Sequence, residues 1–156
     1  MRISSGWIVG LCLALSVTQA QAQFTGNEPD GYFHLWTVPG STLNSAFTTV
    51  YACGNGGKSE VSVAIEVFNE DGTSLNSGTV LATALTLQPG QTKLFVNDPP
   101  LLFSYDSNLG VSGHATGTAR ILVSPKAKKL VCSAWLAGDN LIANLNVVKK
   151  VKQRGD

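Results

Sequence analysis

A serine or cysteine nucleophile needs a histidine within hydrogen-bond reach and a carboxylate behind that histidine. The sequence offers one such grouping, in which Ser112 and His114 are close neighbours, with Asp98 and Asp106 as candidate third members. Residues 110–114 match part of a G-x-S-x-G nucleophile elbow, but His114 replaces the last glycine and no helical pattern follows it. A polar surface loop also explains these residues. We therefore predict no catalytic residue, and a hydrolase that uses His114 is the weakest of the alternatives.

Paired carboxylates and metal ligands are also scarce. Glu60 and Glu66 lie on one predicted strand, about 20 Å apart, whereas glycosidases hold their two carboxyl groups about 5 to 9.5 Å apart. A copper carrier would need methionine and histidine ligands, and the only methionine is Met1. The turn at Asn69 has too few oxygen ligands for a calcium loop. The sequence therefore predicts no metal site and no cofactor.

Residues 1–22 have the layout of a secretory signal peptide. Arg2 gives a basic start, residues 8–17 form a short apolar run, and residues 20–22 read Ala-Gln-Ala, which fits an A-x-A cleavage site. The apolar run is too short to span a membrane, which takes about 20 residues. We expect a secreted or periplasmic protein, cleaved after Ala22 or alternatively after Ala20. No membrane span is expected once the leader is removed.

The composition excludes several classes of protein. Of the 156 residues, 44% are hydrophobic and 13% are charged, which is typical of a folded domain rather than a disordered chain. Removal of the leader also removes Arg2, and equal numbers of basic and acidic residues then remain. A neutral chain has no net field that would draw it toward nucleic acid. We predict no nucleic-acid partner.

Two cysteines remain after cleavage, Cys53 and Cys132. In an oxidising compartment the simplest interpretation is one disulfide, and the loop of about 80 residues that it closes would stabilise the fold by roughly 4 kcal/mol. Two buried free thiols are the alternative. Cys132 shares its strand face with Leu130, Ala134 and Leu136, so we expect it to point into the core. We predict Cα atoms about 5.5 to 6 Å apart.

Short runs of period two, separated by glycine, proline, asparagine and aspartate, predict an all-β domain. Residues 61–68 give the cleanest alternation, with Ser62 and Glu66 on the polar side of a half-buried strand. The predicted strands cover residues 31–38, 46–53, 61–68, 79–87, 92–96, 118–123, 129–137 and 141–148, with a further short strand near 101–105. Without the short one, about seven or eight antiparallel strands in this length predict one β-sandwich, with a small closed barrel as the alternative.

The domain is expected over residues 31–150, with residues 23–30 as an N-terminal arm and residues 151–156 as a C-terminal tail. The stretches TGTARILVSPKAKKLVCSAWLA and LTLQPGQTKLFV are similar to those of small exported bacterial immunoglobulin-like β-sandwich proteins of unassigned activity. This resemblance implies the fold class and no functional residue. Trp135 lies on the opposite parity from Cys132, unlike the tryptophan that packs on the bridge of antibody domains.

Aromatic side chains on the polar side of the predicted strands are the candidate binding residues. Tyr32, His34 and Trp36 alternate along the first strand and share one face, while Trp135 lies opposite the face of Cys132. Large aromatic rings on an exposed face would stack on sugar rings or anchor a protein interface. The alternative is that these rings belong to the core. The sequence predicts Tyr32, Trp36 and Trp135 as partner-binding residues, with Trp36 partly exposed.

These observations predict an exported, non-catalytic binding or structural module of the periplasm or cell surface, which contacts a protein or glycan partner. A pilus-type or strand-exchange assembly subunit is the alternative. Such a subunit would carry an alternating N-terminal extension, whereas residues 23–30 read QFTGNEPD, without alternation. The fold alone does not name a partner, because sandwich domains serve many unrelated functions.

Overall fold

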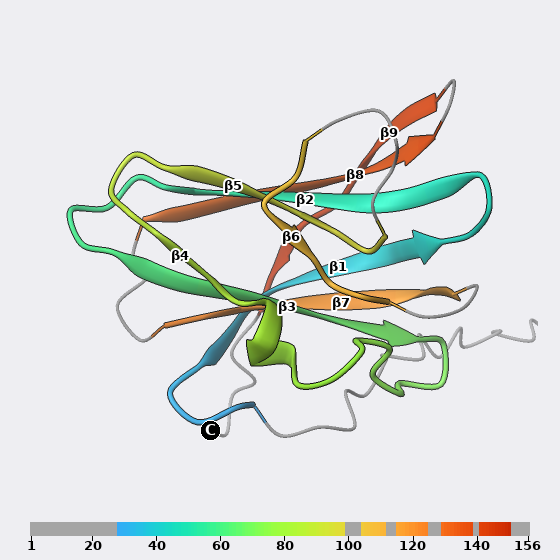
Figure 1. Cartoon of the computed structure of the whole chain (residues 1–156), viewed down its shortest axis with the longest axis horizontal. Coiled ribbons are helices and arrows are strands. Elements are labelled where there is room, and N and C mark those ends of the chain that lie inside the picture. The colour runs from blue at the N-terminus through green and yellow to red at the C-terminus, as the bar shows by residue number, and fades with distance from the viewer. Residues whose placement is uncertain (1–27, 99–103, 112–114, 125–128, 139–140, 151–156) are drawn as a thin grey trace, which may run out of the picture.

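The computed structural model describes residues 28–98, 104–111, 115–124, 129–138 and 141–150 (Figure 1). The predicted signal peptide, most of the predicted N-terminal arm, Ser112, His114 and the predicted C-terminal tail lie outside these residues. Within the described ranges, no helix has both the length and the apolar character needed to cross a membrane.

Strands account for most of the described chain. In chain order they are β1 (Phe33–Leu43), β2 (Phe47–Asn55), β3 (Val61–Asn69), β4 (Leu85–Leu87), β5 (Thr92–Val96), β6 (Ser107–Asn108), β7 (Ala115–Val123), β8 (Leu130–Gly138), β9 (Leu141–Leu145) and β10 (Val148–Lys149). A short 3-10 helix, η1 (Val80–Thr83), precedes β4. The strand pairs are antiparallel, except that β5 and β6 run parallel.

The strands pack as two layers. The first sheet has the order β4-β3-β7-β1-β10, and the second sheet has the order β9-β8-β2-β5-β6. A backbone pair between Leu43 and Thr48 joins the two sheets where β1 turns into β2. Figure 1 shows β5, β2 and β8 in one layer and β3, β7 and β1 in the other. The chain is therefore a β-sandwich, as the sequence predicts, and it does not close into a barrel.

The core lies between the two sheets and takes alternate residues from the regular strands. In β3, the branched side chains of Val63, Ile65 and Val67 face it, as their alternation predicts. Phe95 of β5 lies opposite Tyr51 of β2, and both rings are fully buried there. Phe95 therefore belongs to the main core.

A buried polar network lies inside this core, beside the connection from β1 to β2. Ser41 Oγ donates to Tyr51 Oη at 2.6 Å, and the Tyr51 hydroxyl donates to Asn97 Oδ1 at 3.2 Å. Asn97 Nδ2 in turn donates to Ser41 Oγ and to the Thr42 carbonyl, each at 3.3 Å. Burial raises the pKa of Tyr51, although these hydrogen bonds act in the opposite direction. The network ties β1, β2 and the end of β5 together.

Two predicted strands differ from the structure. The prediction for residues 79–87 is wrong in its first half, because η1 occupies Val80–Thr83 and Leu81 is exposed. The prediction of one strand over 141–148 is also wrong, because β9 belongs to the second sheet and β10 pairs with β1 in the first. The alternation of apolar and polar residues continues from β9 into β10, so the sequence pattern does not reveal that the chain crosses from one sheet to the other between these two strands. The short strand predicted near 101–105 lies mostly outside the described residues.

A β-bulge in β1 reverses the side that its aromatic residues face. In the ladder with β7, His34 lies opposite Leu122, whereas Trp36 lies opposite Ile121, so Leu35 is an extra residue in β1. Ile121 belongs to the core, and Trp36 packs against that core. His34 therefore faces outward and Trp36 inward. The prediction that they share one face is wrong, because simple alternation does not count the bulge.

The predicted disulfide between Cys53 and Cys132 is present. The two cysteines lie directly opposite each other on β2 and β8, with their Cα atoms 4.2 Å apart. The predicted Cα separation of about 5.5 to 6 Å is wrong, because opposed residues of neighbouring antiparallel strands approach to about 4.5 Å when they are not hydrogen-bonded to each other. Cys53 is fully buried, and Cys132 packs against the core as predicted.

Candidate functional site

The outer face of the second sheet exposes large aliphatic side chains. On β8, Cys132 and Ala134 face the core, so the side chains between and beside them point outward. Val131 is one of these, and 72% of its surface is exposed. Ile142 of the neighbouring strand β9 lies opposite Ala137 of β8 and is 75% exposed. Both side chains leave apolar area in contact with water. A partner surface that covered this area would gain the free energy of its burial.

Trp135 lies on this same outer face and is half-buried. It is opposite Val50 of β2 and packs against a hydrophobic cluster that is separate from the main core. The cluster holds Val50, Val96 and Ala137, which are buried, together with the half-buried Leu94. Trp135 and Ile142 are diagonal neighbours across the β8–β9 ladder, since Trp135 pairs with Asn144 and Ala137 pairs with Ile142. This face is therefore apolar at its centre and at its β9 margin.

The three residues predicted to bind a partner do not share one surface. Trp36 points inward from β1, and Trp135 lies on the outer face of the second sheet. Tyr32 precedes β1 and is half-buried, and its backbone N–H donates to the Pro29 carbonyl at 3.0 Å. Trp135 is thus the member of the predicted set that belongs to an apolar outer face, and the role of all three in binding stays a prediction.

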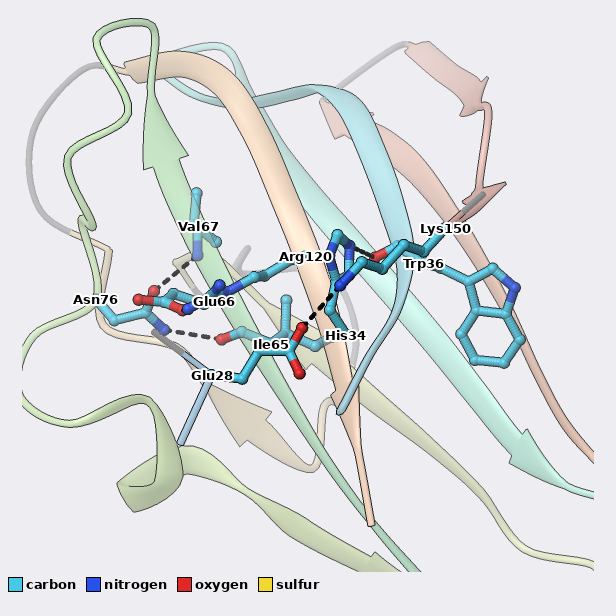
Figure 2. Close-up of polar contacts among 9 residues, drawn as sticks. All are labelled: Glu28, His34, Trp36, Ile65, Glu66, Val67, Asn76, Arg120 and Lys150. Atoms are coloured by element: carbon cyan, nitrogen blue, oxygen red, sulfur yellow. Dashed lines mark hydrogen bonds and ion pairs between the residues drawn. The ribbon is translucent and has the colours of Figure 1, made fainter. Parts of the chain in front are cut away.

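A polar cluster on the outer side of the first sheet fixes both ends of the described chain to β1 (Figure 2). His34 Nε2 donates to the Trp36 carbonyl at 3.0 Å and lies 3.0 Å from Thr37 Oγ1. The Lys150 N–H, just after β10, donates to the Leu35 carbonyl of β1 at 2.9 Å, and Lys150 Nζ donates to Glu28 Oε1 at 3.0 Å. Burial lowers the pKa of His34, and the charge of Lys150 lowers it further. The neutral imidazole is favoured at neutral pH, and its contacts within β1 are structural.

Glu66 and Arg120 form a buried ion pair on the same side of the first sheet (Figure 2). They are opposite each other in the β3–β7 ladder, and Arg120 Nε donates to Glu66 Oε2 at 2.7 Å. The guanidinium of Arg120 also lies over the Phe68 ring, 5.2 Å from its centroid. The prediction of a half-buried β3 with Glu66 on a solvated side is wrong. The charge of Arg120 is what permits the carboxylate to be buried.

Val131 and Ile142 are candidate binding residues that are absent from the predicted set of aromatic rings. The parity of Cys132 already placed Val131 on the outward side of its strand, and Asn144 marked the outward side of β9, which Ile142 shares. Within the described ranges, no group of three or more His, Cys, Asp or Glu side chains is arranged to hold a metal ion. No family model, curated protein or solved structure matches this chain.

Proposed function

We propose that this protein is an exported, non-catalytic binding module whose outer face of the second sheet contacts a partner protein. The observation that carries the proposal is the exposure of Val131 and Ile142 on the same outer face of the sheet as Trp135. Burying a valine or isoleucine side chain contributes about 1.5 to 3 kcal/mol. A partner that covers both side chains would therefore gain a substantial part of the binding free energy that corresponds to a micromolar dissociation constant, which is about 8 kcal/mol.

The kind of side chain favours a protein partner over a glycan. Sugar rings are recognised mainly by flat aromatic faces that stack on them, whereas Val131 and Ile142 offer branched methyl groups. Such groups fit the irregular apolar surface of another protein. Trp135, half-buried at the centre of the face, would then supply the aromatic anchor that protein interfaces commonly use.

Export is the second part of the proposal. Residues 1–22 supply its main support through their signal-peptide layout, and the disulfide between Cys53 and Cys132 agrees with an oxidising compartment. Mass spectrometry of the protein recovered from the periplasm or medium should give a chain that begins at Gln23, or at Gln21 if cleavage follows Ala20. A full-length chain that begins at Met1 and stays inside the cell would contradict export.

The binding face can be tested with a matched pair of valine variants. The partner is first captured by chemical crosslinking to the exported protein, identified by mass spectrometry and purified, and its affinity is then measured by titration. Val131→Asp should weaken binding at least about tenfold, a loss of about 1.4 kcal/mol. Val148→Asp is the control, since Val148 is also exposed but lies on β10 of the first sheet. Equal losses for the two variants, or capture of glycans alone, would refute the proposed face.

A further inference from the structure

Both sheets of the sandwich have edges, and an exposed edge strand can pair with another chain through its unpaired backbone groups. The β3 edge of the first sheet is closed by the segment that follows the strand. Asn76 Oδ1 accepts from the Val67 N–H at 2.8 Å, and Asn76 Nδ2 donates to the Ile65 carbonyl at 3.0 Å (Figure 2). The Leu75 N–H also donates to the Val67 carbonyl at 2.8 Å. This edge is therefore already hydrogen-bonded.

The β5 edge of the second sheet is closed in a similar way. Asp106 Oδ2 accepts from the Leu94 N–H at 2.8 Å, and the Asp106 N–H donates to the Leu94 carbonyl at 2.9 Å. The Leu109 N–H donates to the Val96 carbonyl at 2.8 Å. The opposite edge of the first sheet is the two-residue strand β10, which is protected by its length and by the charge of Lys149.

The β9 edge has none of these protections. Leu141–Leu145 is five residues long and carries no charged residue and no proline. Among the described residues, the strand pairs with β8 on one side, and no hydrogen bond joins its other side to the rest of the fold. The Leu145 side chain lies beside Gly40 of β1, which covers that end of the strand. The open length of the edge is therefore centred on Ile142 and Ala143.

We infer that β9 pairs in antiparallel register with β9 of a second copy of this chain. A second copy fits because an antiparallel strand pair about a two-fold axis presents the same residues to each other from both sides. An axis beside Ile142 places the two Ile142 side chains next to each other, on an outer face that continues from one copy to the next. The strand has no charge to repel its own copy, and the mature chain has no net charge.

This pairing goes beyond the proposed function, with which it shares Ile142, and it does not require the partner protein proposed above. It uses the backbone edge of β9, whereas the partner contact is tested at Val131 on β8, an interior strand of the sheet. Either one can fail without the other. An alternating strand donated by a different subunit is the competing occupant of the same edge.

Sedimentation velocity of the purified, oxidised mature protein tests the inference. The wild type should change from monomer to dimer as its concentration rises, and Ile142→Lys should weaken that association at least tenfold, because two lysines would face each other across the axis. Val131→Lys is the matched control, because Val131 is about as exposed as Ile142 and lies on the same outer face, but on an interior strand of the sheet. It should dimerise like the wild type.

Three results would overturn the inference. The first is that the wild-type protein stays monomeric at every concentration. This result overturns the inference even if the monomer binds an added extended peptide at the β9 edge. The second is equal weakening by the two lysine variants. The third comes from hydrogen exchange of the wild type, which remains informative even if a variant is poorly folded. The backbone amides of β9 should gain protection as the protein is concentrated, and unchanged exchange would exclude pairing at this edge.

Discussion

Glu66 and Arg120 face each other across β3 and β7, and both side chains are almost completely buried. An ion pair removed from water is costly to form, but it is more costly to break, because the remaining charge then has no compensation. Slipping either strand by one residue would turn one of the two charges to the opposite face of the sheet. The pair therefore favours a single register between β3 and β7.

Arg120→Met should destabilise the fold by about 3 to 5 kcal/mol, because it leaves the Glu66 carboxylate buried and uncompensated. The double variant Arg120→Met with Glu66→Leu should recover much of this loss. Urea unfolding followed by tryptophan fluorescence gives both values. If Arg120→Met is as stable as the wild type, the Glu66–Arg120 ion pair does not constrain the pairing of β3 with β7.

Tyr51→Phe should cost about 1 to 3 kcal/mol, since it removes the hydroxyl that links Ser41 and Asn97 in the core. Tyr105 is exposed, so Tyr105→Phe serves as the control and should change the free energy of unfolding by less than about 0.5 kcal/mol. Urea midpoints measured at neutral pH would decide. Similar values for the two variants would show that the network adds nothing to stability.

The same hydroxyl predicts a loss of stability in alkali. Burial raises the pKa of Tyr51 in the folded chain above its ordinary value, which is about 10. The unfolded chain then releases this proton at a lower pH than the folded chain, so the free energy of unfolding should fall as the pH rises above about 10. Tyr51→Phe lacks the group and should show a smaller fall over the same range. Parallel pH profiles for the two proteins would contradict the assignment.

Reduction of the disulfide should lower the free energy of unfolding by about 2 to 5 kcal/mol, because Cys53 and Cys132 join segments that are 79 residues apart in the sequence. The measurement is the urea midpoint with and without a reductant. The double variant Cys53→Ala with Cys132→Ala should match the reduced protein and should not respond to reductant. Identical midpoints with and without reductant would mean that the bridge does not stabilise the fold.

Trp36→Ala should destabilise the protein by about 3 kcal/mol, because the ring packs against the main core. Sequence reasoning alone leads to the opposite expectation, namely a nearly unchanged melting temperature and weaker partner binding. Trp36→Phe retains most of the packed area and should recover most of the stability. A melting temperature for Trp36→Ala that equals the wild type would restore the surface interpretation.

Local chemistry in the sequence predicts many parts of this fold. The segment Gln88-Pro89-Gly90-Gln91 predicts a type II turn, and it forms one, with φ of 79° at Gly90 and the Gln91 N–H donating to the Gln88 carbonyl at 3.0 Å. The strands β3 and β5 follow from their alternation. The disulfide follows from the two cysteines that remain outside the predicted leader and from their parity.

The missed features depend on contacts between distant segments. The bulge at Leu35 is defined by the ladder with β7, and alternation within β1 gives no sign of it. A second register shift occurs at Gly40, where φ is 78°. Burial of Glu66 depends on Arg120, which lies on another strand. The candidate face was missed for a different reason, since its exposed residues are aliphatic and a single valine or isoleucine on the outward side of a strand is not a distinctive sequence signal.

Photo-crosslinking in the cells that produce the protein tests the central claim most directly. A photoreactive amino acid is placed at position 131, on the outer face of the second sheet, and in a separate strain at position 148, which is exposed on the first sheet. Illumination should give a discrete protein adduct from position 131 and none of that mass from position 148. The same adducts from both positions, or none from position 131, would contradict a partner contact on this face.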